Sequence, residues 1–270
     1  MGNTHYSIAT VLTIFMAGLA LGSYLGGRWI DRKKNALLFY AALEAAIGVY
    51  CLLIPSIIDI ASPLFEWIYQ TQTESYSKAS LYRFLVCGAI LLVPTSLMGA
   101  TLPVLSKYVS RERACIGQDV GILYSLNTFG AVFGALSSAF IFMRIWGVLS
   151  TIWFAATLNI MIAVVIYIFF RSGVDADSKE EATQFKGSVE APSINSNTLF
   201  ILLAFGFSGW CALTYQVAWN RILSLLLGSS IYAFSLILTT FILGLAIGTA
   251  MFSQWVNKFK NPLVVFGFLQ

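Results

Sequence analysis

The chain has 270 residues, of which 58% are hydrophobic and only 10% charged, and its mean hydropathy is +0.80. Soluble domains carry roughly a quarter charged residues, so this composition excludes a soluble enzyme or binding module and indicates an integral membrane protein. The formal net charge of +4 comes without the basic face that nucleic-acid binding requires, so the expected partner is the lipid bilayer and not nucleic acid.

Seven apolar segments are close to or above the roughly 20 residues that an α-helix needs to cross a bilayer. In chain order they cover residues 5–29, 36–58, 81–106, 119–143, 148–170, 198–218 and 231–254, and an eighth begins near Pro262. The first segment has neither a basic stretch before it nor a small-residue cleavage site, so we interpret it as a span and not as a signal peptide. The sequence therefore predicts an all-α, polytopic membrane helical bundle.

The basic residues predict the orientation of this bundle, because Lys and Arg accumulate in cytoplasmic loops. If the loop after Gly27 is cytoplasmic and the spans alternate, most of the basic residues lie inside. The outer side keeps only Lys78, Arg83, Arg144 and Arg221. The three outer arginines lie near span ends, where their side chains can reach the membrane interface.

An internal repeat predicts how the spans are organised. The stretch "GNTHYSIATVLTIFMAGLALGS" from Gly2 aligns without a gap with "GSSIYAFSLILTTFILGLAIGT" from Gly228. The second copy is the sixth span after the first, an even number, so the two copies run in the same direction and predict parallel six-helix repeats. On this plan residues 1–170 form a first repeat that lacks its first helix, and residues 198–270 begin a second, so the bundle is expected to be truncated at both ends.

Two polar stretches are predicted to lie outside the membrane. Residues 171–197 are polar with almost no large apolar side chains, which is typical of a solvated linker, here cytoplasmic. Residues 59–80 are predicted to form an outer loop with aromatic residues at the membrane interface. The four cysteines show no paired spacing, so neither a disulfide framework nor a metal site is predicted, and no cofactor is expected.

Glu44 is the strongest candidate for a functional residue, because an ionisable side chain inside a span is costly and marks function by default. It lies about 13 Å into its helix at 1.5 Å per residue, on a face shared with Ala41, Ala45 and Gly48. We expect it to point into the bundle. There it either binds a cation or a proton, or makes a structural hydrogen bond.

Other polar residues within the spans either bind a solute or serve helix packing. Asn127 shares a face with Gly130 and Gly134, and Asn159 has an alanine one turn away on each side, so both are typical of helix–helix contacts. Pro94 and Pro103 each free a carbonyl four residues earlier. We expect a bent helix there, either packed or lining a solute path, with Thr95, Ser96 and Thr101 satisfying the carbonyls.

Three strings carry a resemblance to a known family: "SLMGATLPVLSKYV", "LYSLNTFGAVFGALSSAFIFMRIWG" and "LTYQVAWNRILSLLLGSSIYAFSLILTTFILGLAIG". They resemble the membrane region of large bacterial proteins in which a major-facilitator-like bundle is fused to a spermidine-synthase-like domain. The resemblance implies a multi-pass protein of the bacterial inner membrane that is related to polyamines. It also implies a soluble aminopropyltransferase domain as a partner, and this chain alone is predicted to be non-catalytic.

The resemblance adds Tyr215, Gln216 and Arg221 to the candidate solute-binding residues, beside Glu44, Asn127 and Asn159. The family commonly has Glu where this chain has Gln216, which weakens any role that requires a carboxylate there. The stretch "GGRWIDRKK" also resembles a degenerate major-facilitator loop. A cluster of charges that sets topology is the other interpretation. The glycines at 18, 22 and 26 are interpreted as helix packing, with Gly244 and Gly248 as their copies.

Two functions remain open on the sequence. In the first, the bundle is transporter-like and handles a small, cationic, polyamine-type solute. In the second, it is a non-transporting anchor or scaffold for an aminopropyltransferase domain. A water-accessible Glu44 favours the first function, and a fully packed centre favours the second.

Overall fold

The computed structural model describes residues 5–31, 35–71, 76–109, 116–171, 196–228, 230–255, 265 and 267. Its helices are α1 (His5–Ile30), α2 (Ala36–Thr71), α3 (Tyr76–Val109), α4 (Ile116–Ser137), the π-helical segment η1 (Ser138–Phe142), α5 (Met143–Arg171), α7 (Ser196–Leu227) and α8 (Ile231–Trp255). The described residues contain six helical runs long and apolar enough to cross a membrane and no strands, which confirms the predicted all-helical bundle.

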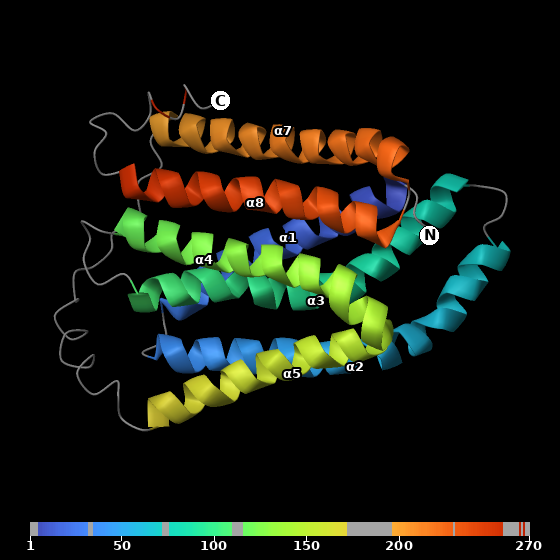
Figure 1. Ribbon diagram of the computed structural model, residues 1–270, viewed down its shortest axis with the longest axis horizontal. Coiled ribbons are helices and arrows are strands. Elements are labelled where there is room, and N and C mark those ends of the chain that lie inside the picture. Colours follow the sequence, from blue (N-terminus) through green and yellow to red (C-terminus); the bar gives the residue numbers. More distant parts are fainter. Residues whose placement is uncertain are drawn as a thin grey trace.

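One of these six runs, Gln118–Arg171, contains two of the predicted spans. The chain reverses direction inside it at Gly147, which has φ 78° and ψ 178°. Glycine adopts this backbone conformation without steric cost, because it has no Cβ atom. The predicted division between residues 143 and 148 is therefore correct, and Figure 1 shows α5 returning beside α2.

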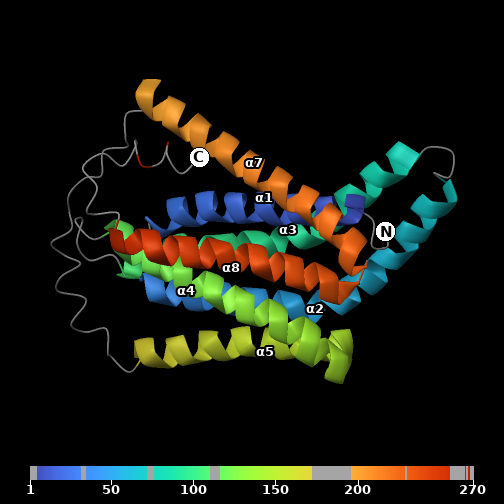
Figure 2. The ribbon, with the colours of Figure 1, turned by 45° about the horizontal axis from the view of Figure 1, so that its top comes forward.

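The predicted outer loop at 59–80 is wrong, because most of it is helical. α2 continues to Thr71, through Pro55 and Pro63, and α3 begins at Tyr76. The segment after residue 58 contains no glycine, and the Ser62 hydroxyl donates to the Ile58 carbonyl at 2.9 Å, so the helix persists beyond the apolar span. Figures 1 and 2 show these two helix ends projecting beyond the rest of the bundle.

Two further predictions fall largely or wholly outside the described residues. The linker predicted at 171–197 is described only at its ends, where α5 stops at Arg171 and α7 starts at Ser196. The stretch "RKK" at 32–34 is also outside the described residues.

The glycines of α1 bring its backbone against the backbone of α3. A Cβ atom added at Gly22 would overlap the carbonyl of Ser96, and one added at Gly26 would lie 2.6 Å from Ala100 Cβ. The contact is reciprocal, because a Cβ atom at Gly99 of α3 would overlap the backbone of Leu19. Small residues at a four-residue spacing permit such close approach in membranes, so the packing interpretation is correct for this copy of the glycines.

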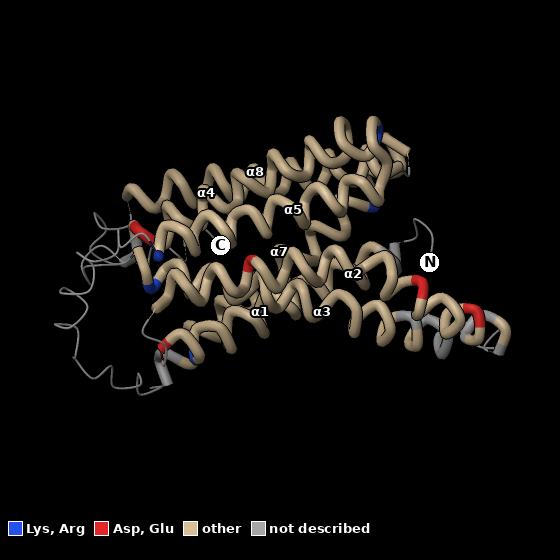
Figure 3. Tube along the Cα trace, turned by 90° about the horizontal axis from the view of Figure 1, so that it is seen from below, with Lys and Arg blue, Asp and Glu red and all other residues tan. Residues whose placement is uncertain are grey.

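Charged groups gather at the two ends of the helices (Figure 3). The end that carries Arg28, Lys107 and Arg171 is called the basic end here. The end where the chain turns at Gly147 and Gly228 is called the hairpin end. At the basic end Lys107 Nζ donates to the carbonyl of Ile30 at 2.6 Å, so a cation of α3 caps the negative C-terminal end of α1.

The second copy of the repeated segment has a different neighbour. α8 runs in the same direction as α1 but packs mainly against α4 (Figure 2). Nothing in the described residues lies within 4 Å of a Cβ atom added at Gly244 or Gly248. Gly18 and Gly22 are therefore aligned with Gly244 and Gly248 in sequence, but the two pairs differ in packing. Among the described residues, only Gly18 and Gly22 lie against another helix.

This difference gives a matched test of the α1–α3 contact. We predict that Gly22→Ala destabilises the protein by about 1–3 kcal/mol, because the new methyl group meets a backbone carbonyl that cannot rotate away. Gly248→Ala, at the aligned position, should change stability by less than about 0.5 kcal/mol. Thermal unfolding of the purified variants in detergent measures both effects. Equal losses for the two variants would contradict the packing described here.

Candidate functional site

Glu44 lies within the membrane-spanning part of α2, about 13 Å from its start at Ala36, and its side chain is only 8% exposed. The carboxylate therefore points into the bundle, as expected from the sequence. Tyr40, one turn earlier on the same helix, is within hydrogen-bonding reach of it.

The neighbours of Glu44 on α2 fix this helix against two others. Leu43 and Tyr40 pack on a buried cluster formed with Ile30 of α1 and Ala100 and Val104 of α3. These apolar contacts position α2 over the α1–α3 pair. The polar side chain of Glu44 thus follows directly on a cluster that contains Ile30 and Val104, the largest fully buried side chains among the described residues.

On the α5 side, the contact is made through Gly48. A Cβ atom added there would lie 2.7 Å from Ile160 Cγ1 and 2.9 Å from the carbonyl of Ala156. Asn159, next to Ile160 in the sequence, is half-buried. Glu44 and Asn159 thus belong to the same pair of packed helices, and they are the two predicted site residues that the structure brings onto neighbouring elements.

The carbonyl that Pro94 leaves without its helical donor is bonded by a residue that the sequence did not indicate. Pro94 cannot donate to the carbonyl of Ile90, and the hydroxyl of Tyr50 on α2 donates to that carbonyl at 2.8 Å. The prediction that threonines of α3 would do this is wrong for the Ile90 carbonyl. Thr95 donates to Leu91 at 2.7 Å, and Thr101 donates to Met98 at 2.7 Å. α3 continues as one helix through both prolines.

Asn127 does not act as a contact between helices in the described structure. Its side chain is exposed, and nothing described lies within 4 Å of a Cβ atom added at Gly130 or Gly134 on the same face. The interpretation of this face as packed within the described bundle is therefore wrong. The helix turns the opposite face, with Ser125, Thr128 and Val132, toward the rest of the bundle.

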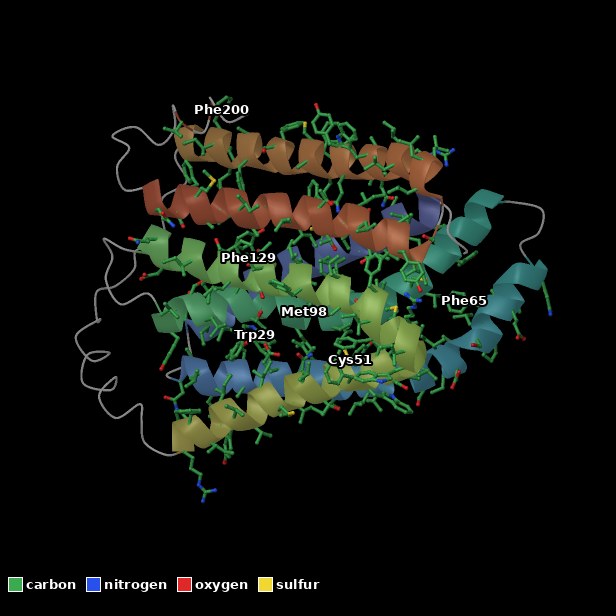
Figure 4. The ribbon with its side chains drawn as sticks, in the orientation of Figure 1. Trp29, Cys51, Phe65, Met98, Phe129 and Phe200 are labelled. Carbon is green, nitrogen blue, oxygen red and sulfur yellow. The ribbon has the colours of Figure 1, made fainter. Side chains whose placement is uncertain are left out.

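α7 exposes most of its apolar surface and buries polar residues. Figure 4 shows Phe200 at its outer edge, and Tyr215 is 64% exposed. Gln216 and Asn220, four residues apart and so on one face, are 4% and 5% exposed. Arg221 is exposed and lies in the last two turns of α7. Of the three candidates in "YQVAWNR", the structure buries only Gln216.

The structure therefore separates the predicted set into parts. Glu44 and Asn159 lie in the α2–α5 pair, Asn127 lies on the exposed face of α4, and the remaining three lie on α7. Sequence reasoning missed Tyr40 and Asn220. Tyr40 lies four residues before Glu44 and Asn220 lies four residues after Gln216, and this spacing could have indicated both. It also missed Tyr50, whose bond to Ile90 no local pattern indicates.

An all-helical bundle with a buried carboxylate among apolar spans defines a multi-pass membrane protein of the transporter-like class. The chain matches the sequence model of the Major Facilitator Superfamily over residues 1–270, so it belongs to this family. The comparisons with curated proteins and with solved structures found no match.

The buried amide of Gln216 gives a second test. Its side-chain oxygen is buried without a hydrogen-bond partner among the described residues. Removing this oxygen loses no bond to a described residue, so Gln216→Met should leave stability unchanged or raise it by up to about 1 kcal/mol. Tyr215→Phe, at the exposed neighbouring position, serves as the control. A loss above about 1 kcal/mol in Gln216→Met, measured by thermal unfolding, would show that the amide is paired.

Proposed function

We propose that this major-facilitator chain moves a small cationic solute across the membrane and that Glu44 supplies the negative charge that binds it. The observation that carries the proposal is the burial of this carboxylate within the span, about 13 Å along α2 from Ala36. A charged side chain at membrane depth costs roughly 2.5–3.5 kcal/mol. A chain that keeps one inside the bundle gains a group that attracts and discriminates cations.

The environment of Glu44 supports reversible binding of a cation. Tyr40 offers a neutral hydroxyl, and the packed cluster beside it consists of apolar side chains. A permanent ion pair with Lys or Arg would neutralise the carboxylate and compete with a cationic solute. The basic residues described on α1, α3 and α5 lie at the basic end or at the hairpin end (Figure 3).

The finer assignment to polyamines rests on the sequence strings that resemble the spermidine-synthase fusions. A linear polyamine carries two or more ammonium groups, each of which can pair with a carboxylate. The same resemblance supports a location in the bacterial inner membrane and an aminopropyltransferase domain as a partner. The repeat supports a domain plan with parallel units at 1–170 and 198–270 joined by the linker at 171–197.

A second candidate function is a non-transporting anchor for such a domain. The observation in its favour is the close packing beside Glu44, where Gly48 brings α2 onto the Ala156 carbonyl of α5. Close packing at the centre is compatible with an anchor and also with one conformational state of a transporter.

Uptake of radiolabelled spermidine and putrescine into proteoliposomes distinguishes the two functions. We predict uptake by the wild-type chain and a loss of at least tenfold in Glu44→Gln, because the amide keeps the shape of the side chain but not its charge. Glu66→Gln is the matched control, since Glu66 is an exposed carboxylate on the same helix. Uptake by Glu44→Gln at the wild-type rate would refute the role of Glu44. Absence of uptake by the wild-type chain would favour the anchor.

A further inference from the structure

α4 and α8 meet along a seam of small and hydroxyl-bearing residues that runs the length of both helices. On each helix a row of buried or half-buried positions recurs at intervals of three and four residues, and the two rows include the contacts of Gly121 with Ser253 and of Ala135 with Ser235. On α4 they are Gly121, Ser125, Thr128, Val132 and Ala135, and on α8 they are Ser235, Thr239, Ile242, Ala246, Thr249 and Ser253. This spacing is typical of two helices that pack side by side along their full length.

Most hydroxyls in the seam bond within their own helix. Ser125 donates to Gly121 at 2.8 Å and Thr128 to Tyr124 at 2.6 Å on α4, while Thr249 donates to Leu245 at 2.8 Å on α8. These bonds lie within single helices, so they would survive if the two helices moved apart. At the basic end, Gly121 and Ser253 are in close contact, since a Cβ atom added at Gly121 would lie 2.5 Å from Ser253 Cβ.

The hairpin end of the seam is held differently. The hydroxyl of Ser235 on α8 donates to the Ala135 carbonyl of α4 at 2.9 Å, and Ser138 donates to the same carbonyl at 3.1 Å. One turn earlier on α8, the ring of Tyr232 packs on Phe140 of η1 with centroids 5.4 Å apart. The Ser235 bond joins α8 to α4 and the ring pair joins α8 to the π-helical segment. Such π-helical segments often occur at functional positions.

Thr239 lies in the same seam one turn beyond Ser235 and differs from the other hydroxyl residues. It is 5% exposed, and its hydroxyl is buried without a hydrogen-bond partner among the described residues. Closing the seam over an unpaired hydroxyl is unfavourable, because the group loses its bonds to water and gains none. Thr239 therefore works against the closed position that Ser235 favours.

We infer that Ser235 and the Ala135 carbonyl, together with the Tyr232–Phe140 ring pair, form a latch that holds the hairpin end of the α4–α8 seam closed. Thr239 keeps the closed position only marginally preferred, so that the latch can open. The inference rests on the proposed function, because opening this end would give a solute access to the interior of the bundle.

Distances between spin labels test the latch directly, in a background whose four cysteines are replaced. One label pair at Ile141 and Ile231, which are 50% and 54% exposed, reports on the hairpin end. A second pair at Ile122 and Met251, 45% and 58% exposed, reports on the basic end. Both pairs are measured in lipid nanodiscs without solute.

Ser235→Ala should at least double the population with a lengthened distance at the hairpin end and leave the basic-end distance unchanged. Thr239→Val, which keeps the shape and removes the unpaired hydroxyl, should act in the opposite direction and reverse the effect when combined with Ser235→Ala. An unchanged hairpin-end distribution in Ser235→Ala, or equal lengthening at both ends, would overturn the latch. Because no solute is present, a chain without uptake would refute the proposed function and leave this result standing.

Discussion

The contact of the α1 backbone with the α3 backbone is the constraint on which the rest of the bundle depends. Gly22, Gly26 and Gly99 bring the two helices so close that a methyl group at any of these positions meets a neighbouring backbone or Cβ atom. Lipid gives no hydrophobic force between helices, so close packing and hydrogen bonds must hold them together. The Lys107 cap on Ile30 adds a charge-assisted bond at the basic end of the same pair.

This rigid pair supports the helix that carries the buried carboxylate. Leu43 and Tyr40 of α2 pack on the α1–α3 cluster, and Tyr50 binds the carbonyl that Pro94 frees in α3. α2 is thus held by apolar packing on one side of Glu44 and by a hydrogen bond on the other. The α4–α8 seam also has one bond between its helices, from Ser235 to the Ala135 carbonyl. It differs in closing over the Thr239 hydroxyl, which has no partner among the described residues, and this supports the inference that its hairpin end can open.

Sequence reasoning succeeded where a local property determined the structure. Length and hydropathy predicted the spans, and the glycine spacing on α1 predicted a close contact, because both depend on residues of a single helix. It failed where the outcome depended on which helix lies opposite. Gly18 and Gly244 are aligned, yet only the first meets a described neighbour, and the face of Asn127 has none. The bond from Tyr50 to Ile90 could not be predicted, because it joins residues far apart in the sequence.

The central claim is that the Glu44 carboxylate binds a cationic solute inside the bundle. Equilibrium binding of radiolabelled spermidine to the purified protein in detergent tests it most directly, because binding does not require a complete transport cycle. The account predicts saturable binding that an excess of putrescine or of salt displaces and that disappears when Glu44 is replaced by Gln. Saturable binding of equal affinity in the variant, or no binding by the wild-type chain, would contradict it.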